Sequence, residues 1–266
     1  MNILQAVVLG LVQGATEFIP ISSSGHLVLA REVFGWEDPG VVFDIFLHLG
    51  TLAAVLIYFR RDWLKIIKDL FGRSGDKRTA INLVVATLPA FILGFLFNDY
   101  INSIFRHALW VSTFLIIVGL IFISAEKFAS HKIIKKDLDK VSWKDALLIG
   151  LVQALALLPG VSRSGITIAA GMFRSLKRTE ATRFSFLMAS IAILGASIFG
   201  SFAAMQDEGY LSGFWPEIVI GSIIAAIVGY LSIKYLMKFL SQHKLYIFAA
   251  YLICLGVIIF AVQWIY

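Results

Sequence analysis

A short polar segment interrupts the first apolar stretch of this 266-residue chain. Residues 13–26 read QGATEFIPISSSGH and bring together a carboxylate, three consecutive hydroxyls and an imidazole. Glu17 follows Gln13 by four residues, so both side chains fall on one face of a helix. Serine nucleophiles are activated by an adjacent general base, and Glu and His are common bases. This segment, the first elbow, therefore carries the residue types of a nucleophile with an acid–base pair.

A second polar segment repeats part of this pattern and adds a permanent positive charge. Residues 151–167 read LVQALALLPGVSRSGIT, with Arg163 between Ser162 and Ser164; residues 158–167 are the second elbow. In each elbow a proline precedes the serines, and a new helix is expected to start there. The free N–H groups of a helix N-terminus favour an anion. The planar guanidinium of arginine suits phosphate oxygens. The two elbows therefore predict a phosphate site.

A charge at membrane depth costs about 2.5–3.5 kcal/mol or more, so Arg163 needs a partner. We expect that partner to be Glu17 when the site is empty and a phosphate when it is full. A purely structural Glu17–Arg163 pair stays open, as do serines bonded to their own backbone. His26 alone could be a packing residue. Asp44 and His48, one helical turn apart at the start of the first span, could line the cavity or only mark its outer end, and we favour the second interpretation.

Composition indicates that the bilayer is the solvent of this chain. Hydrophobic residues make up 59% of it and the mean hydropathy is +0.86, whereas soluble domains are about 45–50% apolar. Six runs are long enough to span a membrane: roughly 41–59, 79–97, 109–125, 180–204, 215–237 and 245–264. Stretches 2–30 and 144–175 are each broken near the middle by Pro, Gly and Ser. We interpret these two as re-entrant helical hairpins, because irregular backbone survives at membrane depth only where protein or water covers it.

Charge in the loops predicts the orientation of the chain. Loops 60–78 and 126–143 are rich in Lys and Arg, whereas 31–40 and 205–214 are mainly acidic. Positive loops stay in the cytoplasm, so both termini are expected outside. The net charge of +6 thus reflects topology, and no nucleic-acid partner is expected. The single cysteine, Cys254, cannot form a disulfide within the chain.

An internal repeat links the two elbows. GLVQ occurs at 10–13 and again at 150–153, and the same offset aligns Ser22 with Ser162, Ser24 with Ser164, and Gly25 with Gly165. Since the copies start on opposite sides, they predict an inverted repeat. Its halves are 1–125 and 144–266, joined by the basic cytoplasmic loop 126–143. The prediction is an all-α polytopic membrane protein, one domain over 1–266, with six transmembrane helices and two re-entrant hairpins.

Two classes of function follow from this arrangement. Inverted repeats with broken helices are typical of transporters, and binding sites lie where the repeats meet. A carrier or flippase for an anion would need Arg163 and the helix ends. It would not need the serine, histidine and glutamate of the first elbow. That additional chemistry favours an enzyme.

The first elbow resembles the E/Q-x-x-x-E segment, and PGVSRSGIT the PGxSRSxxT segment, of the undecaprenyl-diphosphate phosphatase family, also known for bacitracin resistance. The resemblance covers the whole chain in length, span count and motif order. It implies a bacterial inner-membrane enzyme that dephosphorylates the recycled polyprenyl carrier of cell-wall peptidoglycan synthesis, with an active site open to the periplasm. It also implies a polyprenyl diphosphate substrate and a divalent cation, Mg²⁺ or Ca²⁺. A homodimer is left open.

The resemblance implies functional residues at the matched motif positions: Gln13, Glu17, Ser22, Ser23 and His26, and Ser162, Arg163, Ser164 and Thr167. The roles that follow are our predictions for them and for their neighbours. The expected catalytic residues are Glu17, Ser22, Ser23, His26 and Arg163. Phosphate binding is expected from Arg163, Ser162, Ser164, Thr167, Ser24 and Gly25. Ser23 is the first choice of nucleophile, Ser22 the second and water the third. Glu17, with Gln13 nearby, is the expected cation ligand or base, and His26 the proton carrier.

A rival family is excluded. Phosphatidic acid phosphatases also use SGH and SR segments, but their pattern has a histidine six residues after the arginine. Here that position is Ala169. Their pattern also has an earlier Lys-x6-Arg-Pro segment, and this chain has no Arg-Pro dipeptide.

Overall fold

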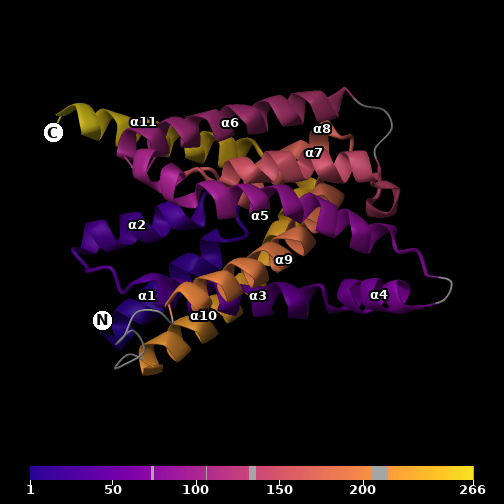
Figure 1. Ribbon diagram of the computed structural model, residues 1–266. Helices are drawn as coiled ribbons and strands as arrows, with labels where there is room; N and C mark the ends of the chain where they lie inside the picture. The colour runs from indigo at the N-terminus through magenta and orange to yellow at the C-terminus, as the bar shows by residue number, and fades with distance from the viewer. Residues whose placement is uncertain (73–74, 106, 132–135, 205–214, 266) are drawn as a thin grey trace.

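The computed structural model describes residues 1–72, 75–105, 107–131, 136–204 and 215–265, and they form a bundle of helices (Figure 1). Within these ranges no strand forms, and the one β-bridge joins Lys136 to Leu176. The helices are α1 (Ile3–Thr16), α2 (Ser23–Phe34), α3 (Val41–Tyr58), α4 (Arg60–Phe71), α5 (Arg78–Phe105), α6 (Ala108–Ser130), α7 (Trp143–Ala154), α8 (Arg163–Phe173), α9 (Arg178–Ala204), α10 (Trp215–Gln242) and α11 (Tyr246–Ile265), with short 3₁₀ turns η1 (Leu138–Lys140) and η2 (Leu155–Leu157). The all-α prediction is confirmed.

Six of these helices are long and apolar enough to cross a membrane: α3, α5, α6, α9, α10 and α11. They match the six predicted spans, so the chain is a multi-pass membrane protein. The predicted hairpins correspond to the pairs α1–α2 and α7–α8, whose members pack against each other. Each of these four helices has only 11 to 14 residues, which is short of the roughly 20 that a span needs.

Each short first helix packs closely on a long helix of the other half of the chain. α1 lies on α10 and α7 on α5. Glycine makes both approaches possible: a Cβ at Gly10 would lie 2.6 Å from the Gly221 carbonyl oxygen, and one at Gly150 would lie 2.4 Å from that of Ala86. Gly10 and Gly150 open the two GLVQ copies. The inverted orientation of the halves stays a prediction.

Residues 60–78, predicted only as a basic loop, contain a helix. In α4 the side chains of Trp63, Ile66, Ile67 and Leu70 recur at helical spacing among charges, and Ile66 is buried. The charges exclude a span but do not prevent an amphipathic helix. The charged loop residues Arg73, Lys132, Lys135, Asp207 and Glu208, which contributed to the predicted orientation, lie outside the described residues.

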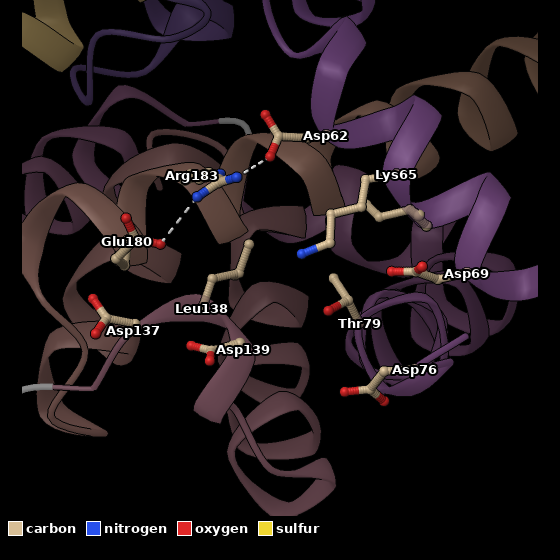
Figure 2. A pocket seen from close by; sticks show the side chains of 11 residues that line it. Asp62, Lys65, Asp69, Asp76, Thr79, Asp137, Leu138, Asp139, Glu180 and Arg183 are labelled. Atoms are coloured by element: carbon tan, nitrogen blue, oxygen red, sulfur yellow. Dashed lines mark hydrogen bonds and ion pairs between the residues drawn. The ribbon is translucent and has the colours of Figure 1, made fainter. Parts of the chain in front are cut away.

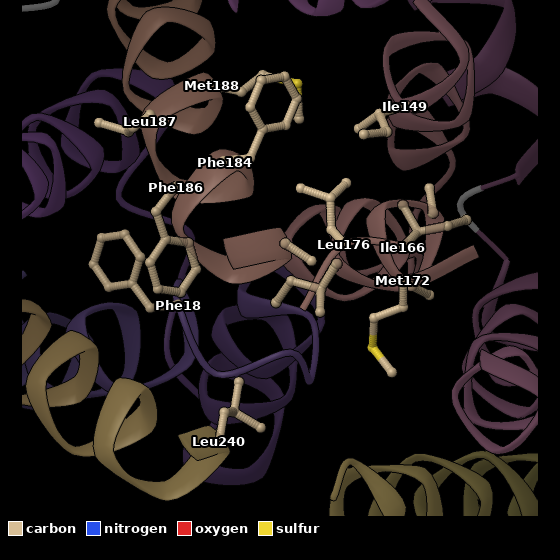
Figure 3. Close-up of a cluster of buried hydrophobic side chains, with 14 of the residues drawn as sticks. Phe18, Ile149, Ile166, Met172, Leu176, Phe184, Phe186, Leu187, Met188 and Leu240 are labelled. Carbon is tan, nitrogen blue, oxygen red and sulfur yellow. The ribbon is translucent and has the colours of Figure 1, made fainter. Parts of the chain in front are cut away.

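The aromatic core fixes the first elbow against α9 (Figure 3). Phe18, directly after Glu17, packs edge-to-face on Phe186 with ring centroids 5.2 Å apart. Phe186 also contacts Phe59 at the end of α3. All three side chains are at most 3% exposed. The backbone beside Glu17 is thereby held by apolar packing, which leaves its polar side chain to face the second elbow.

Candidate active site

The first elbow begins where α1 ends. Gln13 and Glu17 share one face of the helix, as predicted, and the Gln13 Nε2 donates to Glu17 Oε2 at 3.0 Å. The chain then turns, and Ser22 precedes α2 with a left-handed φ of 74°. α2 starts at Ser23, slightly earlier than the predicted restart near Gly25.

The second elbow is held by a glycine turn and a serine cap. Gly160 has a φ of 92°, and a Cβ there would lie 2.8 Å from the Val111 carbonyl oxygen. Ser162 then caps α8, because its Oγ accepts a hydrogen bond from the Gly165 N–H at 3.2 Å. This start places Arg163 in the first turn of α8.

The two elbows meet through one ion pair. The Arg163 Nη2 donates to Glu17 Oε1, although 146 residues separate them in sequence. The Glu17 side chain is 2% exposed, while that of Arg163 is 25% exposed. The predicted partner of Arg163 is therefore confirmed, and the guanidinium keeps an open side from which a ligand can approach.

The serines of the first elbow have different surroundings. Ser23 Oγ donates to Glu17 Oε2 at 2.6 Å. Ser22 Oγ is buried and lacks a hydrogen-bond partner among the described residues. Ser24 is exposed at the surface of α2, and Gly25 lies beside Ser22. Ser23 is thus the hydroxyl that donates to the carboxylate, and its role as nucleophile stays a prediction.

His26 lies apart from the carboxylate contacts. Its Nδ1 donates to the Ser22 carbonyl oxygen at 2.8 Å, since a carbonyl only accepts. Its Nε2 lies 2.5 Å from the Tyr251 hydroxyl, and the two rings stack. Both ring nitrogens are thus engaged away from Ser23, and the predicted role of His26 as proton carrier gains no direct contact.

A second imidazole occupies the position expected of His26. His48 Nε2 lies 3.7 Å from Glu17 Oε2, while its Nδ1 donates to the Asp44 carbonyl oxygen at 2.7 Å. The interpretation of His48 as only an end marker is wrong, because α3 carries it to the elbow. Asp44 instead pairs with Arg31. The sequence did contain a signal for this role, because an ionisable side chain inside a predicted span usually belongs to a functional site.

The other hydroxyls of the second elbow bond within the protein. Ser164 lies 3.3 Å from the Ser162 Oγ. Thr167 Oγ1 donates to the Arg163 carbonyl oxygen at 2.7 Å and lies 2.7 Å from the Ser185 Oγ, a contact that sequence reasoning missed. These groups fix the helix start that carries Arg163.

The described residues include no group of three His, Cys, Asp or Glu side chains placed to hold a metal ion. The Glu17 carboxylate and the side-chain oxygen of Gln13 are nevertheless adjacent. Gln13 Oε1 is buried and has no partner in the described part of the chain, while its amide nitrogen rests on Glu17. Mg²⁺ commonly binds one or two carboxylates and completes its shell with water and substrate phosphates. The donor set therefore fits a cation that shares the oxygens of a phosphorylated ligand.

Comparison with known proteins places almost the whole chain in one family. Residues 6–258 match the family model described as bacitracin resistance protein BacA. A protein of Desulforudis audaxviator named undecaprenyl-diphosphatase is 41% identical over 266 residues, covering 98% of both chains. One of the same name from Moorella thermoacetica is 42% identical over 266 residues, covering 99% of both. The chain belongs to the bacitracin resistance protein BacA family.

Proposed function

We propose that this protein hydrolyses undecaprenyl diphosphate to undecaprenyl phosphate and inorganic phosphate. The observation that carries the proposal is the Glu17–Arg163 pair, with Ser23 hydrogen-bonded to the same carboxylate. The names of the relatives give the substrate. An anion carrier would need the arginine but not the hydroxyl on the carboxylate.

In this proposal the terminal phosphate docks between the elbows. Arg163 exchanges Glu17 for the phosphate oxygens, and the N–H groups at the starts of α2 and α8 bind the same anion. This exchange frees the Glu17 carboxylate to act as a base. Positioning and electrostatic stabilisation then supply most of the rate, as in other phosphoryl transfers.

The terminal phosphoryl group is transferred in two steps. Ser23 Oγ attacks the terminal phosphorus while its proton passes to Glu17, and undecaprenyl phosphate leaves. Water then attacks the phosphorus of the phosphoserine and the bond from phosphorus to Ser23 Oγ breaks. Glu17 returns its proton to Ser23, and the hydrogens of the water leave with the inorganic phosphate. In the alternative, a water molecule activated by Glu17 attacks directly. In its protonated form His48 can donate from Nε2 to Glu17 or to the entering phosphate, because its Nδ1 already donates to the Asp44 carbonyl oxygen.

A divalent cation, Mg²⁺ or Ca²⁺, held by Glu17 and Gln13 Oε1 would neutralise charge on the diphosphate. Gln13 supplies only a neutral oxygen, so Glu17 provides the one carboxylate. We expect a chelator to abolish phosphate release and added cation to restore it.

The proposed setting is the bacterial inner membrane, with the site open to the periplasm and both termini outside. The charges of the described residues support this orientation, because Lys and Arg are enriched in cytoplasmic segments. They are Arg60, Arg61, Lys65 and Lys68 of α4, with Lys77 before α5 and Arg78 at its start. In this membrane the product would re-enter cell-wall lipid recycling.

The test is phosphate release from undecaprenyl diphosphate by protein purified in detergent. Glu17→Gln and Arg163→Gln are expected to lower kcat/KM by roughly 10²–10⁴-fold, the range for a lost acid–base or charge-stabilising group. Lys238→Gln, an exposed change on α10, is the control and should retain the parent rate. Parent rates in folded Glu17 and Arg163 variants would overturn the proposal.

A further inference from the structure

A cavity of about 610 Å³ opens between the starts of α5 and α7, away from both elbows. Its lining includes Lys77, Arg78, Asn82, Lys140, Ser142 and Trp143. None of these residues belongs to the candidate active site. Lys140 ends η1, and Ser142 caps α7. The cavity is therefore lined by the segment before α5, by η1, and by the starts of α5 and α7.

The charge of this cavity favours an anion. Lys77, Arg78 and Lys140 face it with one carboxylate, Asp76. Asp76 Oδ1 accepts a hydrogen bond from the Arg78 backbone N–H at 3.0 Å, and the same residue also lines the neighbouring cavity. In the part of the chain that the structure describes, neither Lys77 nor Lys140 forms an ion pair. The Lys77 ammonium is therefore available to a ligand, and the Lys140 ammonium also interacts electrostatically with Asp137.

The neighbouring cavity has the opposite character. It measures about 390 Å³ and is lined by carboxylates from α4, η1 and α9 (Figure 2). Arg183 there is neutralised by its ion pairs with Asp62 and Glu180. An anion is thus repelled from the acidic cavity and directed to the basic one.

Two apolar stripes lead away from the basic cavity along the outer face of the bundle. They start at Ile81 and Trp143, which line the cavity. Side chains three or four residues apart share one helix face. The exposed members are Ile81, Val84 and Leu88 on α5, and Trp143, Leu147 and Leu151 on α7. Both stripes begin at the same cavity, and α5 packs against α7, so acyl chains that leave the cavity can contact exposed apolar side chains of both helices.

We propose that this cavity binds the headgroup of an anionic phospholipid, whose acyl chains lie along the two stripes. Basic pockets between transmembrane helices on the cytoplasmic side suit such headgroups, and Trp143 lies where interfacial tryptophans are enriched. A free phosphate would use the lysines but would gain nothing from the stripes. The lipid holds the start of α7 against α5, and therefore anchors the hairpin that carries Arg163.

The test is lipid retention by the detergent-purified full chain, measured by native mass spectrometry during titration with phosphatidylglycerol or phosphatidylcholine. The parent should bind phosphatidylglycerol more tightly than phosphatidylcholine. The double variant Lys77→Gln with Lys140→Gln should bind it roughly 30-fold more weakly at low salt, because each lysine near an anionic lipid contributes about five-fold. The control is Lys234→Gln with Lys238→Gln, the same charge change on exposed α10 residues, and it should bind as the parent does.

Two further arms separate lipid from free anion and from misfolding. Glycerol phosphate, a headgroup without chains, should not displace phosphatidylglycerol at equal concentration; equal competition would overturn the lipid assignment. A third variant, Leu147→Gln, keeps every charge and should also weaken retention. The proposal would be overturned if the double variant retained phosphatidylglycerol as the parent does, or if the parent bound the two lipids equally. Neither result depends on the phosphatase activity of the protein.

Discussion

At the scale of single residues, the two neighbouring serines of the first elbow are expected to differ. Ser23 donates to Glu17, whereas Ser22 Oγ points into a buried place without a partner among the described residues. We predict that Ser23→Ala lowers kcat by roughly 10²–10⁴-fold, while Ser22→Ala costs less than about tenfold. Phosphate-release kinetics on both variants measures this, and equal losses would contradict the assignment of Ser23.

The two imidazoles make a second comparison. His48 lies 3.7 Å from Glu17, but His26 bonds to Tyr251 instead. We predict that His48→Ala lowers kcat by roughly tenfold or more, with an unchanged melting temperature. Tyr251→Phe, which removes only the hydroxyl on His26, should have a smaller effect. A larger loss in the Tyr251 variant would return the leading role to His26.

How far the sequence predicts the site depends on how local each contact is. The Gln13–Glu17 contact follows from helical spacing, and the pairing of Glu17 with Arg163 follows from the cost of an unpaired charge at membrane depth. His48 and Ser185 were not predictable in this way, because their places depend on how α3 and α9 pack on the elbows.

At the scale of elements, close helix contacts at glycine should control the position of the hairpins. A Cβ at Gly150 would meet the Ala86 carbonyl at 2.4 Å, whereas one at Gly94 would lie 3.4 Å from Leu157. We predict that Gly150→Ala destabilises the protein by about 1–3 kcal/mol through overpacking. Gly94→Ala makes the same chemical change in a helix and should be neutral or stabilising. Thermal unfolding in detergent compares them, and similar melting temperatures would contradict the close packing of α7 on α5.

The start of α7 should depend on pH. Asp145 lies outside the six spans; burial raises its pKa, but hydrogen bonds from Ser142, Arg174 and Lys136 outweigh this and hold the pKa at about 2, below the usual 3.8. Because the folded pKa is the lower one, the stabilisation is present above about pH 4 and is lost as the pH falls toward 2. Melting curves across this range should show parent and Asp145→Asn converging in acid. A constant difference would contradict the pairing.

Hydropathy predicted the six spans because each carries its own apolar run. It did not reveal α4, whose residues alternate charge and apolar surface and whose burial at Ile66 depends on neighbouring elements.

At the scale of the whole molecule, the predicted orientation places α4 and the α2–α3 connection on opposite sides of the membrane. In a Cys254→Ser background, a cysteine replacing Glu37 should react with an impermeant maleimide on intact cells. A cysteine replacing Lys68 should react only after the membrane is opened. The reverse pattern would contradict the predicted orientation.

If both elbows form one phosphate site, Glu17 and Arg163 act on the same ligand, and a double-mutant cycle measures their coupling. The measurement is kcat/KM for undecaprenyl diphosphate in the parent, Glu17→Gln, Arg163→Gln and the combined variant. Residues that act as a unit give strongly non-additive losses. We predict that the combined variant is no more than about tenfold slower than the slower single variant. Losses that simply multiply would contradict a shared site.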